Sequence, residues 1–153
     1  MEGELSLETY LKRLGSLHCA KINGRRVLAK PMFILAIINA IDDKKIVTNR
    51  FYWNPQEEQY NILNKYYKEC FGGYAPNSYI TPLHKPFFHL NYEGFWHLKI
   101  NDSVKLPSSS SSGFLKTNLE YAYFDDAFWN ILQGQNNRDV IRDYIVEKYI
   151  KSS

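Results

Sequence analysis

Three stretches of the chain carry basic side chains and no acidic ones, a charge pattern typical of a surface that binds a polyanion. Residues 9–41, 70–92 and 103–119 hold nine of the 19 Lys and Arg residues, and all 16 Asp and Glu residues lie outside them. The net charge is only +3, so the sorting of charge is more informative than its total. The alternative is that folding scatters these residues over the surface. The nine basic residues are Lys12, Arg13, Lys21, Arg25, Arg26, Lys30, Lys85, Lys105 and Lys116.

Two groups of residues within these stretches have the chemistry of a site for a nucleic-acid backbone. Arg25 and Arg26 precede Lys30, which lies beside Pro31 at the predicted start of a helix. Free backbone N–H groups and the positive end of the helix dipole favour a phosphate there. The second group, residues 84–89, interleaves cationic or titratable groups with a proline and two aromatic rings. The simpler alternatives are a solvated lysine before a helix and a strand that places a phenylalanine in the core.

The sequence contains few of the motifs expected of a metal site or a catalytic centre. His84, His89 and His97 are close along the chain, but no Cys pair or carboxylate accompanies them at ligand spacing. Gly72-Gly73 lacks the Lys and Ser/Thr of a phosphate-binding loop, and there is no nucleophile elbow. We expect no metal, no cofactor and no catalytic centre. A small nuclease that uses His84 or His89 is the enzymatic alternative.

The helices that must position these residues are indicated by the spacing of apolar side chains. Ser6 is a predicted N-cap for a first helix with an apolar stripe that reaches Leu17. Residues 32–41, which follow Pro31, are apolar nearly all round and predict a helix in the middle of the core. Asn54-Pro55 followed by acids predicts a third helix, which Gly72-Gly73 should end near residue 71.

The second half of the chain predicts β-structure and then two more helices. Two β-rich runs around a turn that ends in Gly94 predict a hairpin at about residues 86–100. Five serines after Pro107 predict a flexible loop at about 106–113, and 114–123 is a further candidate strand. Helices should follow at 125–132 and after Asn136 or Asn137. The expected class is α+β, with helices packed around a small antiparallel sheet in one domain spanning 1–153.

The cellular setting follows from the cysteines and the apolar runs. Cys19 and Cys70 are isolated, which indicates free thiols rather than a disulfide framework. Residues 1–4 lack the plan of a signal peptide, and the apolar run 32–38 is too short to cross a bilayer. We expect a monomeric cytoplasmic protein that does not associate with membranes.

The order of the motifs resembles the DNA sulfur-binding domain of McrA-type phosphorothioate-dependent restriction endonucleases. The resemblance runs from about Leu5 to Ile150. It rests on Lys30-Pro31 opening an apolar helix, on two later motifs and on the two C-terminal helices. The two motifs are Lys85-Pro86-Phe87-Phe88-His89-Leu90 and Glu93-Gly94-Phe95-Trp96-His97-Leu98.

The resemblance implies a ligand and a set of roles. In such domains an apolar surface cavity receives the sulfur that replaces a non-bridging phosphate oxygen, and basic residues hold the neighbouring backbone. By correspondence, Lys85, Pro86 and Phe88 would form the cavity, with Lys30 and His89 at its charged edge. The segment 105–116 would approach a groove of the DNA. This chain has Lys85 where the family commonly has an aromatic residue, His89 where it commonly has Arg, and Ala29 where it often has His.

The expected function is therefore recognition of phosphorothioate-modified double-stranded DNA, in restriction or defence, without catalysis. An HNH nuclease domain is not expected in the chain, which would therefore bind without cutting, act with a nuclease in trans, or be an excised domain. One alternative is a general DNA-binding domain of a restriction or repair system without sulfur preference. Another is a protein–protein interaction module, whose binding would survive high salt. The residues expected to contact DNA are Arg25, Arg26, Lys30, His84, Lys85, His89, Lys105 and Lys116.

Overall fold

A buried helix, α2 (Ala29–Asp42), forms the centre of the molecule in the computed structural model, which describes residues 6–151. The predicted core helix is confirmed, because every side chain from Met32 to Ile38 is at most 1% exposed. A helix that is apolar on every face is stable only when other elements cover all of it. Residues 1–5 lie outside the described residues. They include the segment that lacks the plan of a signal peptide and Leu5, where the resemblance begins.

Among the described residues, the most extensive helix contacts of α2 are with three other helices. They are α3 (Glu58–Tyr74), α4 (His84–His89) and α7 (Gln135–Ile145). An ion pair ties α7 to the end of α2, since Arg138 Nε donates to Asp42 Oδ1 at 2.5 Å. The covering of α2 thus combines apolar contact with a charge pair at one end.

The first helix of the described chain packs against the last two. α1 (Leu7–Leu14) packs on α6 (Asp126–Leu132) and α7, and α7 continues as a π-helical segment, Val146–Lys151. Ser6 is the N-cap of α1 as predicted, because its side chain accepts the Thr9 N–H at 3.2 Å. The expected helix at 125–132 is confirmed by α6.

Tyr149, in the π-helical segment, holds the chain that leaves α1. Its hydroxyl donates to the Leu14 carbonyl at 2.5 Å and accepts the Leu17 N–H at 3.0 Å. The Arg26 guanidinium lies 5.2 Å from the centre of the Tyr149 ring, in cation–π contact. Residues at the far end of the chain therefore fix the segment between α1 and α2.

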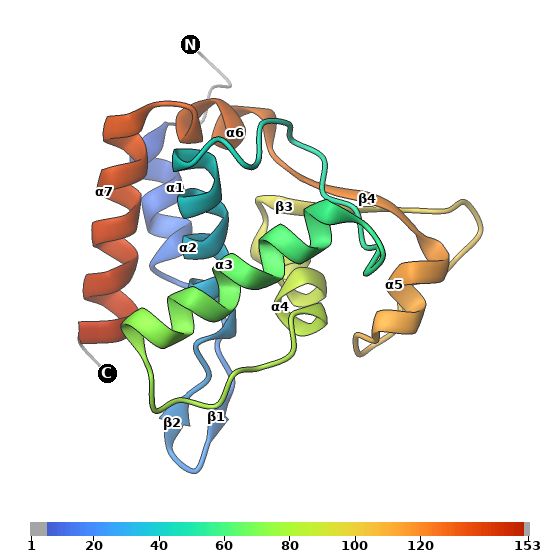
Figure 1. Ribbon diagram of the computed structural model, residues 1–153, viewed down its shortest axis with the longest axis horizontal. Helices are drawn as coiled ribbons and strands as arrows, with labels where there is room; N and C mark the ends of the chain where they lie inside the picture. The colour runs from blue at the N-terminus through green and yellow to red at the C-terminus, as the bar shows by residue number, and fades with distance from the viewer. Residues whose placement is uncertain (1–5, 152–153) are drawn as a thin grey trace.

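That segment contains a small hairpin, which the sequence analysis did not predict. β1 (Lys21–Ile22) pairs with β2 (Arg25–Arg26) around Asn23 and Gly24. The turn residues have φ of 53° and 77°, the left-handed conformation that an Asn-Gly hairpin turn favours. Figure 1 shows this hairpin projecting from the body of the molecule below α2.

A second antiparallel sheet confirms the α+β class. β3 (Trp96–Ile100) pairs with β4 (Leu119–Phe124), from Trp96 opposite Phe124 to Ile100 opposite Leu119. Phe51 extends it by an isolated bridge to Ala122. The candidate strand at 114–123 is shorter than expected, because α5 (Ser112–Asn118) occupies its first half. α5 lies at the far end of this sheet in Figure 1.

The hairpin predicted at 86–100 is wrong. Residues 84–89 form α4, Leu90–Glu93 form a 3₁₀ turn, and β3 pairs with β4 instead. Pro86 lies in the first turn of α4, where a missing N–H costs no helical hydrogen bond. A strand would have turned either Phe87 or Phe88 outward, whereas the helix buries both completely.

Two loop predictions also need correction. Gly72-Gly73 does not end α3, which continues to Tyr74. The serine segment is structured at its end: Ser111 accepts the Phe114 N–H at 3.0 Å as the N-cap of α5, and Gly113 lies inside that helix. The chain from 101 to 110 has no helix or strand, and its flexibility stays a prediction.

Both cysteines are free thiols as expected, with Cys70 buried and Cys19 half-buried. Among residues 6–151, no helix has the length and apolar character needed to span a membrane.

Replacing Gly72 with Ala tests the correction to α3. Gly72 is exposed within the helix and an added Cβ meets nothing within 4 Å, so Gly72→Ala should raise the free energy of unfolding by about 0.5–1 kcal/mol. Urea unfolding measures the change. Gly94→Ala is the control. Gly94 has a φ of 93°, a left-handed conformation that a Cβ disfavours, so this substitution should lower the free energy of unfolding by about 1 kcal/mol. A destabilised Gly72→Ala protein would mean that α3 ends there.

Candidate nucleic-acid interface

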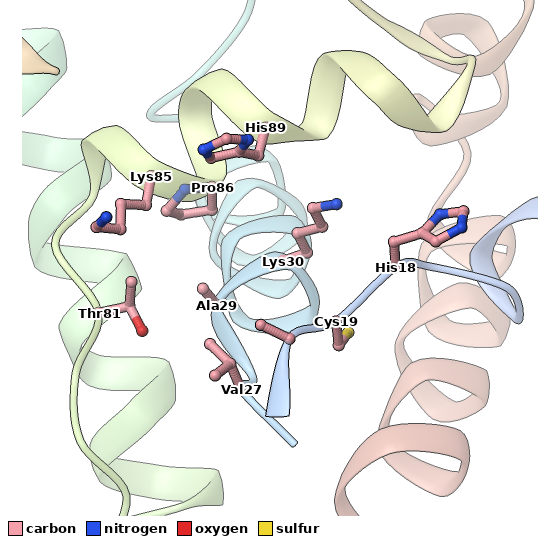
Figure 2. A pocket seen from close by; sticks show the side chains of 10 residues that line it. His18, Cys19, Val27, Ala29, Lys30, Thr81, Lys85, Pro86 and His89 are labelled. Carbon is pink, nitrogen blue, oxygen red and sulfur yellow. The ribbon is translucent and has the colours of Figure 1, made fainter. Parts of the chain in front are cut away.

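A hollow of about 350 Å³ opens at the surface where the start of α2, the start of α4 and the segment after α1 meet. Figure 2 shows Pro86 and Ala29 near its centre, with Lys85, His89 and Lys30 around them. Apolar atoms thus form the floor, and cationic or titratable groups form the rim. The lining residues are His18, Cys19, Ala20, Val27, Ala29, Lys30, Thr81, Lys85, Pro86 and His89.

The floor is set by how α4 is anchored. Phe87 and Phe88 are fully buried, and the Trp96 indole N–H donates to the Phe87 carbonyl at 2.8 Å. With these neighbours in the core, the Pro86 ring faces the hollow. Ala29, at the first position of α2, has a side chain small enough to leave space beside that ring.

The wall of the hollow opposite α4 is formed by residues at the open end of the β1–β2 hairpin. The Val27 N–H donates to the Ala20 carbonyl at 2.7 Å, which closes the β1–β2 hairpin beside the hollow. Cys19 lies on the same wall, and burial raises the pKa of its thiol despite the nearby Lys30 and Arg26. The wall therefore presents a neutral thiol and aliphatic carbons rather than charge.

The first turn of α2 borders the hollow through Ala29 and Lys30. Pro31 has no N–H, and the first N–H to bond within the helix is that of Met32, which donates to the Leu28 carbonyl at 3.0 Å. The N–H groups of Ala29 and Lys30 therefore belong to the unbonded first turn. Together with the helix dipole they favour an anion at this edge of the hollow.

Lys30 is paired with an acid that the sequence interpretation did not include in the site. Its Nζ lies 2.5 Å from Glu93 Oε2, and the two side chains are 12% and 4% exposed. Glu93 lies one residue beyond an acid-free stretch and 63 positions from Lys30, so charge counting along the chain gave no signal for the pair. Lys85 is exposed at the rim.

The two histidines of α4 are held towards their neutral forms. Burial lowers the pKa of His89, and the nearby charges of Lys30 and Lys85 lower it further. Burial and Lys85 have the same effect on the pKa of His84. His84 lies away from the hollow's lining, with Nδ1 3.0 Å from Ser110 Oγ. A nearby anion would reverse these shifts, because it favours the charged imidazolium.

The structure brings together four of the residues predicted for the site: Lys30, Lys85, Pro86 and His89. Arg25 and Arg26 line a neighbouring hollow of about 530 Å³ with Lys21 and Ser78. The linings of the two hollows alternate along this part of the chain, since Ala20 and Val27 line the first and Lys21 and Arg26 line the second. The basic hairpin thus continues directly from residues that line the apolar hollow.

Two predicted contacts lie elsewhere on the surface. Lys105 and Lys116 are exposed, the first in the connection after β3 and the second in α5, and neither lines the hollow. The Ser110–His84 contact joins the connection to α4. A role for either lysine in binding stays a prediction.

Phe88 cannot line the hollow, so that part of the predicted cavity is wrong. Its side chain is fully buried because both phenylalanines of α4 face the core. Residues that the sequence interpretation missed take its place on the lining: His18, Cys19, Val27 and Thr81. They come from three separate segments, and only the Asn-Gly turn signal of the hairpin could have indicated part of this wall.

His97 belongs to a different cluster. Its Nε2 lies 2.5 Å from Asp125 Oδ1, and the Tyr10 hydroxyl donates to the other oxygen of that carboxylate at 2.8 Å. Within the described part of the chain, no three His, Cys, Asp or Glu side chains are grouped so that they could hold a metal ion.

Comparison with solved structures identifies the architecture. The chain superposes on the sulfur-binding domain of ScoMcrA complexed with phosphorothioated DNA with a TM-score of 0.69 and 15% identity, covering 94% of this chain and 89% of that one. The chain has the fold of a sulfur-binding domain. The corresponding domain of SprMcrA, also complexed with phosphorothioated DNA, gives a TM-score of 0.68 at 14% identity, covering 94% and 85%.

In ScoMcrA this fold makes up only part of a longer chain. A separate superposition on the Type IV phosphorothioation-dependent restriction endonuclease ScoMcrA covers 92% of this chain but 29% of that one, with a TM-score of 0.66 and 15% identity. No protein-family model and no curated protein matches the sequence. The likeness in three dimensions confirms the resemblance at the level of the fold.

Titration of the histidines tests the electrostatics of the rim. We expect NMR to give pKa values for His84 and His89 below the ordinary 6.5, and Lys85→Met should raise both because it removes a nearby positive charge. Lys45→Met removes an exposed charge elsewhere and should leave both values unchanged. Unchanged histidine values in Lys85→Met would show that Lys85 does not face them.

Proposed function

We propose that this chain binds double-stranded DNA that carries a phosphorothioate, with the sulfur seated in the hollow on Pro86 and Ala29. The observation that carries the proposal is an apolar floor ringed by Lys30, Lys85 and His89 on a sulfur-binding fold. The structures of similar fold from ScoMcrA and SprMcrA are complexes with phosphorothioated DNA, which supports the same ligand here.

The chemistry of the floor favours sulfur over oxygen. Sulfur is larger and less strongly hydrated than a phosphate oxygen, so it loses little when apolar atoms replace water. An oxygen in the same place would lose hydrogen bonds to water that the Pro86 ring and the Ala29 methyl group cannot replace. An unpaired polar group of that kind costs about 1–3 kcal/mol.

Affinity for the DNA backbone would come from the charges around the floor. Lys85 at the rim and Lys21 and Arg25 on the adjoining hairpin are exposed cations that can reach phosphates on either side of the modified one. Such contacts release counterions, so binding should weaken as salt increases. Lys105 and Lys116 could extend the contact along the duplex.

The proposal includes no reaction at the hollow. The chain would recognise modified DNA in restriction or defence, and a nuclease acting in trans would cleave the strand. A general DNA-binding domain shares the salt dependence without the preference for sulfur, so a comparison of matched duplexes separates the two functions.

Matched duplexes that differ in one sulfur atom test the proposal. We expect the modified duplex to bind at least about tenfold more tightly in fluorescence anisotropy, which corresponds to about 1.4 kcal/mol. Lys30→Glu and Lys85→Glu should each weaken binding by about tenfold or more, whereas Lys45→Glu, an exposed residue elsewhere, should have a smaller effect. Equal affinity for the two duplexes would leave only general DNA binding.

The affinity should also depend on pH through His89. A phosphate or phosphorothioate near the imidazole favours its charged form, so the pKa of His89 should rise on binding from its lowered value in the free protein. Binding then takes up a proton, and affinity increases as the pH falls from 8 to 5.5. His89→Asn should flatten this dependence in anisotropy titrations. A variant with the same pH profile as the unmodified protein would place His89 away from the DNA.

A further inference from the structure

Glu93 is a buried acid at the edge of the hollow, in the 3₁₀ turn that follows α4. Its side chain is 4% exposed, and Oε2 lies 2.5 Å from Lys30 Nζ. The same oxygen accepts the backbone N–H of His18 at 3.1 Å, and the His18 ring lies 3.6 Å from Oε1. These contacts fix the carboxylate between two residues of the lining.

This ion pair changes the charge that a ligand meets. Lys30 is only 12% exposed, so Glu93 rather than water balances its ammonium group. Figure 2 shows that ammonium directed towards His18 and away from Lys85. Because the pKa of His89 is lowered, its imidazole adds little positive charge at neutral pH. The uncompensated charge of the lining is therefore that of Lys85, at the rim.

We propose that Glu93 determines the selectivity of the hollow for sulfur, because it cancels the charge of Lys30 beside the apolar floor. This inference rests on the function proposed above and names a specificity residue for it.

The argument follows from what an oxygen would need in the hollow. A charged oxygen that leaves water can be compensated by a free ammonium, since charge-assisted hydrogen bonds are the strong ones. With Glu93 in place, the Lys30 ammonium is already paired and hydrogen-bonded, so oxygen remains poorly compensated. Sulfur needs less compensation because it is less hydrated. Removing the charge of Glu93 should therefore help an ordinary phosphate more than a phosphorothioate.

Glu93→Gln tests this with little change of shape, because the amide oxygen can still accept from Lys30 and from the His18 N–H. We expect the affinity for the unmodified duplex to rise about tenfold and that for the modified duplex about threefold, so the preference for sulfur falls about threefold. Glu69→Gln, an exposed acid on α3 in a separate hollow, makes the same change in net charge and should leave the preference unchanged.

A double-variant cycle gives a second, independent measurement. Lys30→Gln leaves the Glu93 carboxylate unpaired beside the DNA and should weaken binding to both duplexes. Adding Glu93→Gln removes that repulsion, so the double variant should bind both duplexes more tightly than Lys30→Gln alone. A residue with only a structural role would make the double variant weaker still. The cycle also decides the matter if Glu93→Gln alone fails to fold in thermal unfolding.

The outcomes separate the inference from the proposed function. If the unaltered protein prefers the modified duplex and folded Glu93→Gln keeps the full preference, or loses affinity for both duplexes, Glu93 is not the selectivity residue. If the unaltered protein binds both duplexes equally, the proposed function fails and this inference fails with it.

Discussion

Phe87 and Phe88 are fully buried, and the indole of Trp96 holds the carbonyl between them through a 2.8 Å hydrogen bond. This anchoring of α4 is the constraint on which the hollow depends, because it decides which residue of a short helix, Pro86, lines the hollow. Once both aromatic rings are in the core, Pro86 has to face the start of α2. The packing of the core, rather than the conformation of a loop, therefore determines the shape of the hollow at Pro86.

The distribution of charged residues along the sequence predicted part of the charge around the hollow but not all of it. Two acid-free stretches do meet there and supply Lys30 and Lys85, as the sequence predicted. Glu93, however, lies in the turn after α4 and forms an ion pair with Lys30. A separation of 63 residues gives no local pattern, so only the folded chain brings the two side chains together.

Periodicity predicted the helical parts of the fold, since the Ser6 cap and the uniformly apolar run of α2 are strong local signals. It failed at residues 84–89, because a short apolar run with a proline fits a strand or a first helical turn equally well. The true partner of β3 is β4, about twenty residues further along, and strand pairing of that kind depends on tertiary packing. The Pro86 and Lys85 positions were predictable from family resemblance, whereas the wall at Cys19 and Val27 was not.

The hydroxyl of Tyr149 bonds to both sides of the turn after α1, and its ring supports Arg26. One wall of the hollow therefore depends on a side chain more than 120 positions downstream. During synthesis on the ribosome, α2 and the hairpin emerge long before this tyrosine, so the wall cannot take its final form until the segment that contains Tyr149 has been made. A partly made chain would expose its basic residues without the shaped floor. If the chain binds DNA as proposed, such an intermediate would therefore attract DNA of any kind before it could select for sulfur.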